Sequence, residues 1–223
     1  MASDVDVCNL ALGYLGDEAT VVNINPPDGS AQAALCSRFY PIARDSLLEM
    51  HPWGFAAKRV PLALLSATPP SQWAYVYAQP SDELNLLGVY DPSAMNDTAA
   101  AIPMPNTYYG AAQAGQGIYT PQPFVAETLP DGTDVIYTNQ QYAVLHYTSL
   151  IADTTKFSPL FTEALAWLLA SKLAGPLLKG QVGAEAARSC MAAFQLWMGK
   201  ATASDANQRR QDILPGTPWM TGR

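Results

Sequence analysis

Residues 51–59 read HPWGFAAKR, directly after a stretch with helical character. The residue before a proline is driven out of the helical conformation, so Pro52 is expected to end the preceding helix. Trp53 and Phe55 can bury large apolar areas, and Gly54 lets the backbone turn between them. The stretch therefore predicts a structural corner. The alternatives are a nucleic-acid stacking platform and a ligand-binding aromatic box.

Two helices are expected before this corner. The first covers about residues 5–15, can be capped by Ser3 or Asp4 and ends at Gly16, with an apolar stripe of Val5, Cys8, Leu12 and Leu15. The second begins near Asp28 or Ser30 and runs to about Met50, and its predicted inner face is Leu35, Phe39, Ile42 and Met50. Pro41 removes a backbone hydrogen bond inside this helix, so a kink or a split is expected there.

After the corner the pattern changes to short, alternating, strand-like segments. Helical patterns return at Ser158-Pro159, with a break expected at Gly175-Pro176, and again over about residues 184–201, where Ala187, Met191, Phe194 and Met198 form the predicted stripe. The prediction is an α+β fold. It has a helical body (1–52 and 153–202), a β-rich module (53–152) with a long loop (91–117), and an extended C-terminal tail (203–223).

The charge distribution limits what the β-rich module can bind. The formal net charge is −7, yet no Lys or Arg occurs from residue 60 to residue 155. The acids in that interval are Asp82, Glu83, Asp91, Asp97, Glu127, Asp131, Asp134 and Asp153. Nucleic-acid binding relies on cationic side chains that neutralise phosphates, so it is disfavoured in this module, and Tyr75 and Tyr77 are expected to pack rather than stack on bases.

Signatures of catalysis, metal binding and cofactor binding are sparse. Neither His51 nor His146 has a partner at metal-ligand spacing, and the motifs of nucleotide sites, serine hydrolases and zinc proteases do not occur. The cysteines are far apart and are expected to be buried, unbridged apolar residues, namely Cys8, Cys36 and Cys190. No enzymatic activity, metal or cofactor is predicted. Neither a secretory signal nor a membrane span is expected.

Two further features concern surface contacts. Arg44 and Asp45 are neighbours on a helix, so they are expected to point apart, with Arg44 tied to another element. The tail combines arginines with large apolar residues, a combination that anchors interfaces, so docking on a partner is expected through Arg209, Arg210, Ile213, Leu214 and Trp219.

The ordered set of features resembles the tail tubular protein A family, the head-to-tail adaptors of short-tailed phages. The run AALCSRFYPIARDSLLEMHPWGFAAKRVPL (33–62) carries a Tyr, an Arg-Asp pair, a Pro-Trp and a Phe-Ala in the family's order, at Tyr40, Arg44, Asp45, Pro52, Trp53, Phe55 and Ala56. WAYVYAQPSDELNLLGVY (73–90) and residues 136–174 are similar to later segments of that family. The resemblance covers about residues 3–180. Leu84 and Asn85 stand where relatives often carry a basic residue.

The resemblance implies a structural virion protein without enzymatic activity, assembled in the host cytoplasm into the neck of the particle. Such adaptors form a ring, usually twelvefold, between the portal protein and the tail nozzle, and they can help to seat tail fibres. Genome DNA passes through the ring without sequence-specific binding. The tail is then expected to dock on the portal. The acids Glu127, Asp131 and Asp134 are hypothesised to face the lumen, where a surface that does not retain phosphates favours DNA passage.

Two other function classes are open on the sequence alone. The aromatic, acidic β-rich region also fits a carbohydrate- or fibre-binding virion protein, which would be a monomer or trimer that binds glycans. A hydrolase with an unrecognised site is the third class, and it requires a convergent set of acid, base or nucleophile residues that the sequence does not display.

Overall fold

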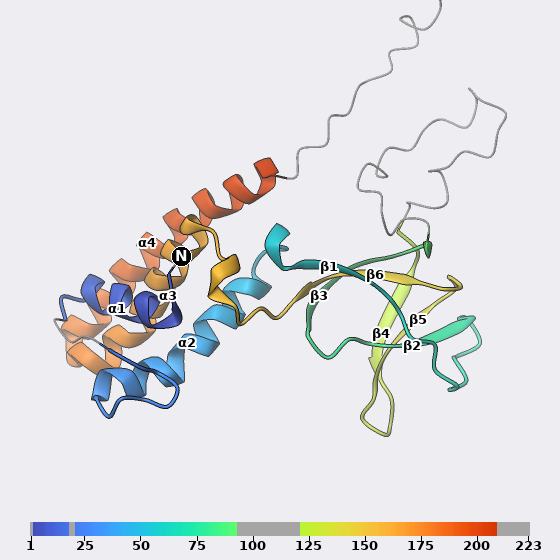
Figure 1. Ribbon diagram of the computed structural model, residues 1–223, viewed down its shortest axis with the longest axis horizontal. Helices are drawn as coiled ribbons and strands as arrows, with labels where there is room; N and C mark the ends of the chain where they lie inside the picture. The colour runs from blue at the N-terminus through green and yellow to red at the C-terminus, as the bar shows by residue number, and fades with distance from the viewer. Residues whose placement is uncertain (1, 18–20, 93–120, 209–223) are drawn as a thin grey trace, which may run out of the picture. The chain divides into compact units, whose positions relative to one another are not determined.

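A computed structural model of the chain describes residues 2–17, 21–92 and 121–208. The fold is α+β, as predicted (Figure 1). The chain divides into two compact units. The helical unit comprises Met1–Ala56 with Ser149–Gln208, and the β unit comprises Ala57–Thr148. The β unit is thus one continuous insertion between the two halves of the helical unit.

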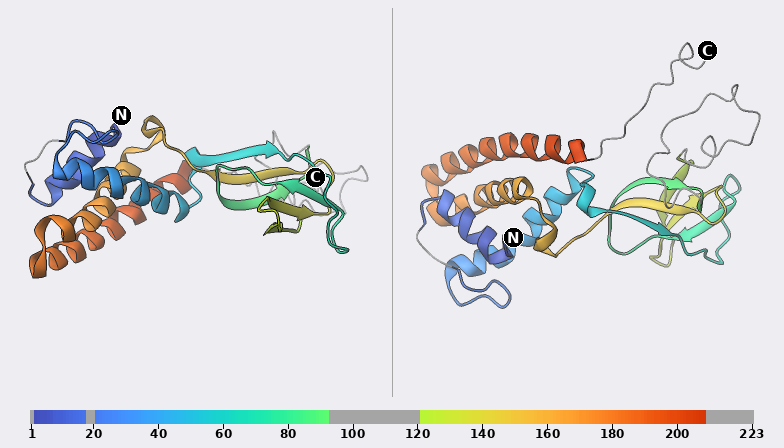
Figure 2. Two further views of the ribbon diagram at one scale, coloured as in Figure 1. Left: turned by 90° about the horizontal axis from the view of Figure 1, so that it is seen from below. Right: turned by 45° about the horizontal axis from the view of Figure 1, so that its top comes forward.

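The helical unit is built around α3 (Pro159–Leu178), which packs against α1 (Asp4–Tyr14), α2 (Ala31–Glu49) and α4 (Gly180–Gln208). Figure 2 shows α3 and α4 lying side by side along their lengths. A wide face of α3 is apolar and buried, which allows this one helix to pack against three others. Its buried residues are Phe161, Ala164, Leu165, Ala166, Leu168, Leu169, Ala170, Leu173 and Ala174.

The predicted helix starts are confirmed by their caps. Ser3 caps α1 in a capping box with Asp6, and Ser30 caps α2 through a bond from the Ala33 amide. Ser158 caps α3, with Pro159 at its first position. In each case the serine hydroxyl accepts from an amide that the helix itself leaves unpaired, which favours the start at that residue.

The predicted inner face of α2 is wrong. Ile42 is 51% exposed and Met50 is 54% exposed, while Leu35 and Phe39 are half-buried. The buried stripe lies on another side of the helix and consists of Ala33, Cys36, Tyr40, Ala43, Leu47 and Leu48. Small side chains in this stripe let α2 approach α3 closely.

The expected break at Gly175-Pro176 is wrong, and of the two outcomes expected at Pro41, a kink or a split, the split does not occur. Helix α2 continues through Pro41, and α3 continues through Gly175-Pro176 to Leu178. The break between α3 and α4 falls instead at Lys179, whose φ of 55° and ψ of 167° belong to a region that is strained for a residue with a side chain. The two helices then meet closely at Gly183, where an added Cβ would lie 2.9 Å from the Ala174 carbonyl oxygen.

Helix α4 is longer than predicted at both ends. It runs from Gly180 to Gln208 rather than from about 184 to 201, so residues 203–208 are helix and not extended tail. Of the predicted stripe, Phe194 is buried, Ala187 and Met198 are half-buried and Met191 is 38% exposed, and the buried residues of the helix follow a spacing of seven and four. The buried set is Gly183, Cys190, Phe194, Ala201 and Asp205.

The three cysteines are buried and unbridged, as predicted. Cys8 of α1 and Cys36 of α2 lie against each other, and the hydrogen bond between their thiols, together with burial, raises the pKa of Cys8. Within the described part of the chain, each helix is too short or too polar to cross a lipid bilayer.

The β unit contains two three-stranded antiparallel sheets. One has the order β1-β6-β3, from Ala57–Pro61, Val144–Ser149 and Glu83–Tyr90, and the other has the order β2-β5-β4, from Tyr75–Ala78, Asp134–Thr138 and Phe124–Thr128. Residues 62–65 connect the sheets: the Leu62 amide donates to Ala143, and the Leu65 amide donates to Val76. Most of the expected loop 91–117 lies outside the described residues.

The core of the β unit draws on both sheets. Its main cluster contains Tyr77, Val89, Ile136, Ala143, Leu145 and Tyr147. Val76, on the other face of the same strand as Tyr77, packs in a second cluster with Val135 and Tyr137. Both faces of β2 are therefore covered by apolar neighbours. The Tyr77 ring is only 2% exposed, which assigns it to packing as expected.

Candidate functional site

Trp53 is the centre of the corner that the sequence predicts. Helix α2 ends at Glu49, and the chain turns at His51 and Pro52 before the short 3-10 helix η1 (Gly54–Ala56). The Trp53 side chain is 1% exposed, and its Nε1–H donates to the Leu47 carbonyl oxygen over 2.9 Å. The buried indole thus satisfies its polar atom on the helix that it follows, which fixes the direction in which the chain leaves α2.

Phe55 extends this packing to the second half of the helical unit. Its ring centroid lies 5.1 Å from that of Phe161 on α3 and 5.8 Å from that of Phe157. Phe157 precedes α3 and follows η3 (Thr154–Lys156). The Trp53 and Phe161 rings meet edge to face at 4.9 Å. We call His51, Trp53, Phe55, Phe157 and Phe161 the aromatic corner. It joins the segments that lead into and out of the insertion.

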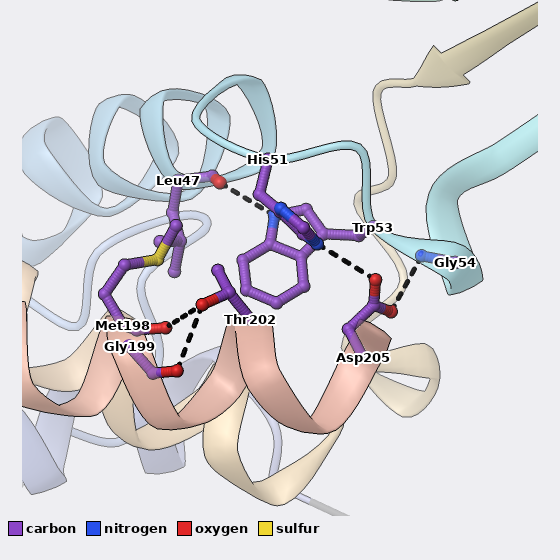
Figure 3. Close-up of polar contacts among 8 residues, drawn as sticks. All are labelled: Leu47, His51, Trp53, Gly54, Met198, Gly199, Thr202 and Asp205. Atoms are coloured by element: carbon purple, nitrogen blue, oxygen red, sulfur yellow. Dashed lines mark hydrogen bonds and ion pairs between the residues drawn. The ribbon is translucent and has the colours of Figure 1, made fainter. Parts of the chain in front are cut away.

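Asp205, near the end of α4, closes the aromatic corner from the other side (Figure 3). Its Oδ1 accepts the Gly54 backbone N–H over 2.8 Å, and its Oδ2 lies 3.0 Å from His51 Nε2. The residue is 6% exposed. A buried carboxylate needs such polar partners, so the end of α4 is fixed to the turn that follows α2.

The role of Gly54 differs from the expected one, in which glycine is needed for its conformational freedom at the turn. Gly54 begins a right-handed 3-10 turn, so its use is not the left-handed conformation that glycine permits. What the structure uses is its backbone N–H, which donates to Asp205. Thr202, one turn before Asp205, bonds its hydroxyl back to the carbonyl oxygens of Met198 and Gly199, each at 3.0 Å (Figure 3).

The arrangement around His51 supports a structural part for this residue. Its ring meets the Trp53 ring edge-on, with centroids 4.7 Å apart, and Nε2 faces Asp205. Within the described residues, no group of three His, Cys, Asp or Glu side chains is placed to hold a metal ion. The geometry fixes three chain segments to one another.

The remaining signature residues lie on α2 and its exit. Tyr40 is 3% exposed, and burial raises the pKa of its hydroxyl, which has no hydrogen-bond partner among the described residues. Pro52 is half-buried at the turn. The expectation that Arg44 and Asp45 point apart is wrong, because Arg44 Nε lies 2.8 Å from Asp45 Oδ1. A pair on one helix surface contributes little to stability.

The three candidate channel acids are brought together on one hairpin. Glu127 lies on β4, Asp131 lies in the following turn with Gly132 at φ 87°, and Asp134 begins β5. All three are exposed. Asp131 accepts the Thr133 amide over 2.9 Å, and Asp134 accepts the Thr128 hydroxyl over 2.7 Å. We call Glu127, Asp131 and Asp134 the acidic hairpin.

More negative charge lies close to the acidic hairpin. Burial, and then the charges of Asp134 and Asp82, raise the pKa of Glu83 at the start of β3. Asp82 itself is held by Lys58 Nζ at 2.6 Å and by the Tyr147 hydroxyl at 2.9 Å. The Lys58 contact, ahead of the other causes, lowers the pKa of Asp82. Lys58, one of the last two basic residues before the interval 60–155 that contains no Lys or Arg, is thus already paired with Asp82.

The sequence did not single out Asp205, Phe157 and Phe161 as one site. The sequence pattern places Asp205 in the predicted extended tail, although its spacing from Ala201 and Phe194 continues the buried pattern of α4. That spacing is the signal in the sequence that could identify Asp205. The tail residues Arg209, Arg210, Ile213, Leu214 and Trp219 lie outside the described residues.

Comparison with known proteins yields no family for the chain. No protein-family model matches it, and no curated protein matches it significantly.

Proposed function

We propose that this chain is a structural adaptor subunit of a virion neck, which assembles into a ring between the portal protein and the tail nozzle of a short-tailed phage. The observation that carries the proposal is the placement of the signature residues. Tyr40, Arg44 and Asp45 lie on α2, and Trp53 and Phe55 form the turn at which the β unit is inserted. The residues of the resemblance thus coincide with the junction of the architecture.

The two-unit construction suits a ring subunit. A closed ring needs two different surfaces on each copy, one for each neighbour. A compact helical unit and an inserted β unit supply separate surfaces on one chain. The aromatic corner and Asp205 hold together the segments on both sides of the insertion, which is where load between neighbouring proteins in a particle would pass.

The test is assembly on purified portal rings. The full chain is expected to add a second ring to the portal, visible by negative-stain imaging and as a mass increase in sedimentation. A chain that ends at Gln208 keeps α4 and Asp205 but lacks the tail, and it is expected to lose portal binding. A cut after Ala203 would also remove Asp205 and confound folding with docking.

A matched control is the full chain with Leu196→Asp, which changes a 60% exposed residue of α4 and should bind normally. If the chain ending at Gln208 binds the portal as well as the full chain does, the docking role of the tail is wrong. If the full chain binds glycans as a monomer or trimer and never stacks on a portal ring, the adaptor function itself is wrong.

The acidic hairpin is proposed to face the DNA channel. Its three carboxylates are exposed, and no Lys or Arg occurs from residue 60 to residue 155 to offset them. Changing Glu127, Asp131 and Asp134 to lysine is expected to slow genome ejection, because each cation would add a salt-dependent phosphate contact. Ejection is timed on purified particles at two salt concentrations. Amide replacements at the same positions should have a smaller effect, and unchanged kinetics in the lysine particles would contradict the placement.

A further inference from the structure

Helix α2 carries a second apolar stripe that nothing in the described structure explains. We call Leu35, Phe39, Ile42 and Met50 the outer α2 face. Ile42 and Met50 are 51% and 54% exposed, and Leu35 and Phe39 are half-buried. The buried stripe of the same helix lies next to this face, about a third of a turn away, and packs against the other helices. The apolar surface of α2 therefore extends beyond its buried stripe onto an exposed side, and exposed apolar surface of this kind is typical of a contact site.

The tail begins close to one end of this face. Asp205 is bonded to His51 (Figure 3), and His51 directly follows Met50, so the turn of α4 that carries Asp205, three residues before the helix ends, lies near the C-terminal end of α2. The residues from 209 onward leave from this point. Chain that starts there needs no long connection to reach the outer α2 face.

The length of the tail matches that of the face. Ile213 and Trp219, six positions apart, are separated by roughly 20 Å in extended chain. Met50 and Leu35 are separated by roughly 22 Å along a helix. An extended tail running back along α2 would therefore set Ile213 and Leu214 near Met50 and Ile42, and Trp219 near Phe39 and Leu35.

The charges at the start of the tail also agree with this direction. Arg209 and Arg210 come first, and α2 carries no basic residue in its last turn. The carbonyl end of a helix attracts cations. Arginines placed there would complement the helix end before the apolar residues reach the stripe.

We propose that residues 209–223 dock on the outer α2 face of their own chain. Ile213, Leu214 and Trp219 cover the stripe, and Arg209 and Arg210 lie at the end of α2. The inference concerns the isolated chain and does not depend on the adaptor function. If that function also holds, the portal and the outer α2 face compete for the same residues, and the tail stays covered until a portal ring displaces it.

The test is digestion of the full chain by chymotrypsin, which cleaves after Trp219 only when the tail is undocked. Release of residues 220–223 is followed by mass spectrometry in the absence of any portal. Cleavage tracks the undocked population, so Ile42→Asp is expected to accelerate it about tenfold or more. Ile213→Asp, on the tail side, should do the same. The control Leu196→Asp, at a similarly exposed apolar position on α4, should change the rate less than about twofold.

Three outcomes would overturn the proposal. The first is cleavage of the unaltered chain as fast as that of a free peptide of residues 209–223. The second is an unchanged rate in both Ile42→Asp and Ile213→Asp chains whose thermal melting matches the unaltered protein. The third is protection that rises with protein concentration, because the face would then be covered by a second copy.

Discussion

Replacing Trp53 with alanine is expected to lower the free energy of unfolding by about 3–5 kcal/mol, the range for deleting a large buried aromatic side chain. The indole is 1% exposed and packs against the rings of His51, Phe55 and Phe161. Its removal leaves a cavity at the crossing of three chain segments. Chemical denaturation followed by far-ultraviolet circular dichroism measures the change, because the helices that surround Trp53 dominate that signal.

Two further variants separate packing from hydrogen bonding at this position. Trp53→Phe loses the Nε1–H that donates to Leu47 but keeps an aromatic ring in the site. It is therefore expected to lower the free energy of unfolding by less than Trp53→Ala does. Trp197→Ala, at a half-buried indole on α4, should have a much smaller effect. Equal effects at Trp53 and Trp197 would contradict the aromatic corner as the main anchor of the helical unit.

Replacing Asp205 with alanine is expected to lower the free energy of unfolding by about 2–3 kcal/mol, because two polar groups at a buried site lose their hydrogen-bond partner. The Gly54 amide and His51 Nε2 both face this carboxylate, over 2.8 Å and 3.0 Å. The same denaturation measurement applies. The last turns of α4 should also lose protection against hydrogen exchange, since they are held to the rest of the unit at this residue.

The conservative control is Asp205→Asn, which keeps one oxygen acceptor of nearly the same shape and should retain much of the stability. Ser204→Ala, one position earlier, should be within about 0.5 kcal/mol of the unaltered protein. A stable Asp205→Ala protein with unchanged exchange at the end of α4 would show that the carboxylate does not fix that helix.

The sequence predicts the elements well where a local signal exists. Ser3, Ser30 and Ser158 mark helix starts because a serine before a helix satisfies unpaired amides, whatever the rest of the chain does. The corner at Trp53 is predicted for a similar reason, since Pro52 ends a helix through local sterics. These signals act within a few residues, so a single sequence carries them completely.

The buried face of α2 could not be predicted in the same way. The helix has two stripes with apolar residues, and the larger side chains at Leu35, Phe39, Ile42 and Met50 give the stronger pattern. Burial instead follows the stripe that includes Ala33, Cys36 and Ala43, where small side chains allow close contact with α3. Which stripe is covered depends on the neighbouring helix, and local periodicity does not contain that information.

The breaks expected inside helices are absent for a related reason. Pro41 and Pro176 each cost a backbone hydrogen bond and crowd the preceding turn, and the rule that they interrupt a helix considers these local costs alone. Tyr40 and Ala43 are buried on the two sides of Pro41, and Leu173 and Ala174 are buried just before Pro176, so packing in the helical unit favours continuous helices. Local sequence patterns do not reveal the role of Asp205, because its partners, His51 and Gly54, are more than 150 positions away in sequence.

The split of the helical unit around the β unit sets an order on folding during synthesis. The β unit is continuous, so all of its residues are synthesised before α3. Helices α1 and α2 precede the β unit, but their main packing partner is α3. The corner at Trp53 is complete only after Phe161 and Asp205 have been synthesised, because Phe161 packs on the Trp53 ring and Asp205 accepts the Gly54 amide. The first-made helices are therefore the last to be buried, and their apolar faces stay open to other chains, including chaperones, throughout the translation of everything between them.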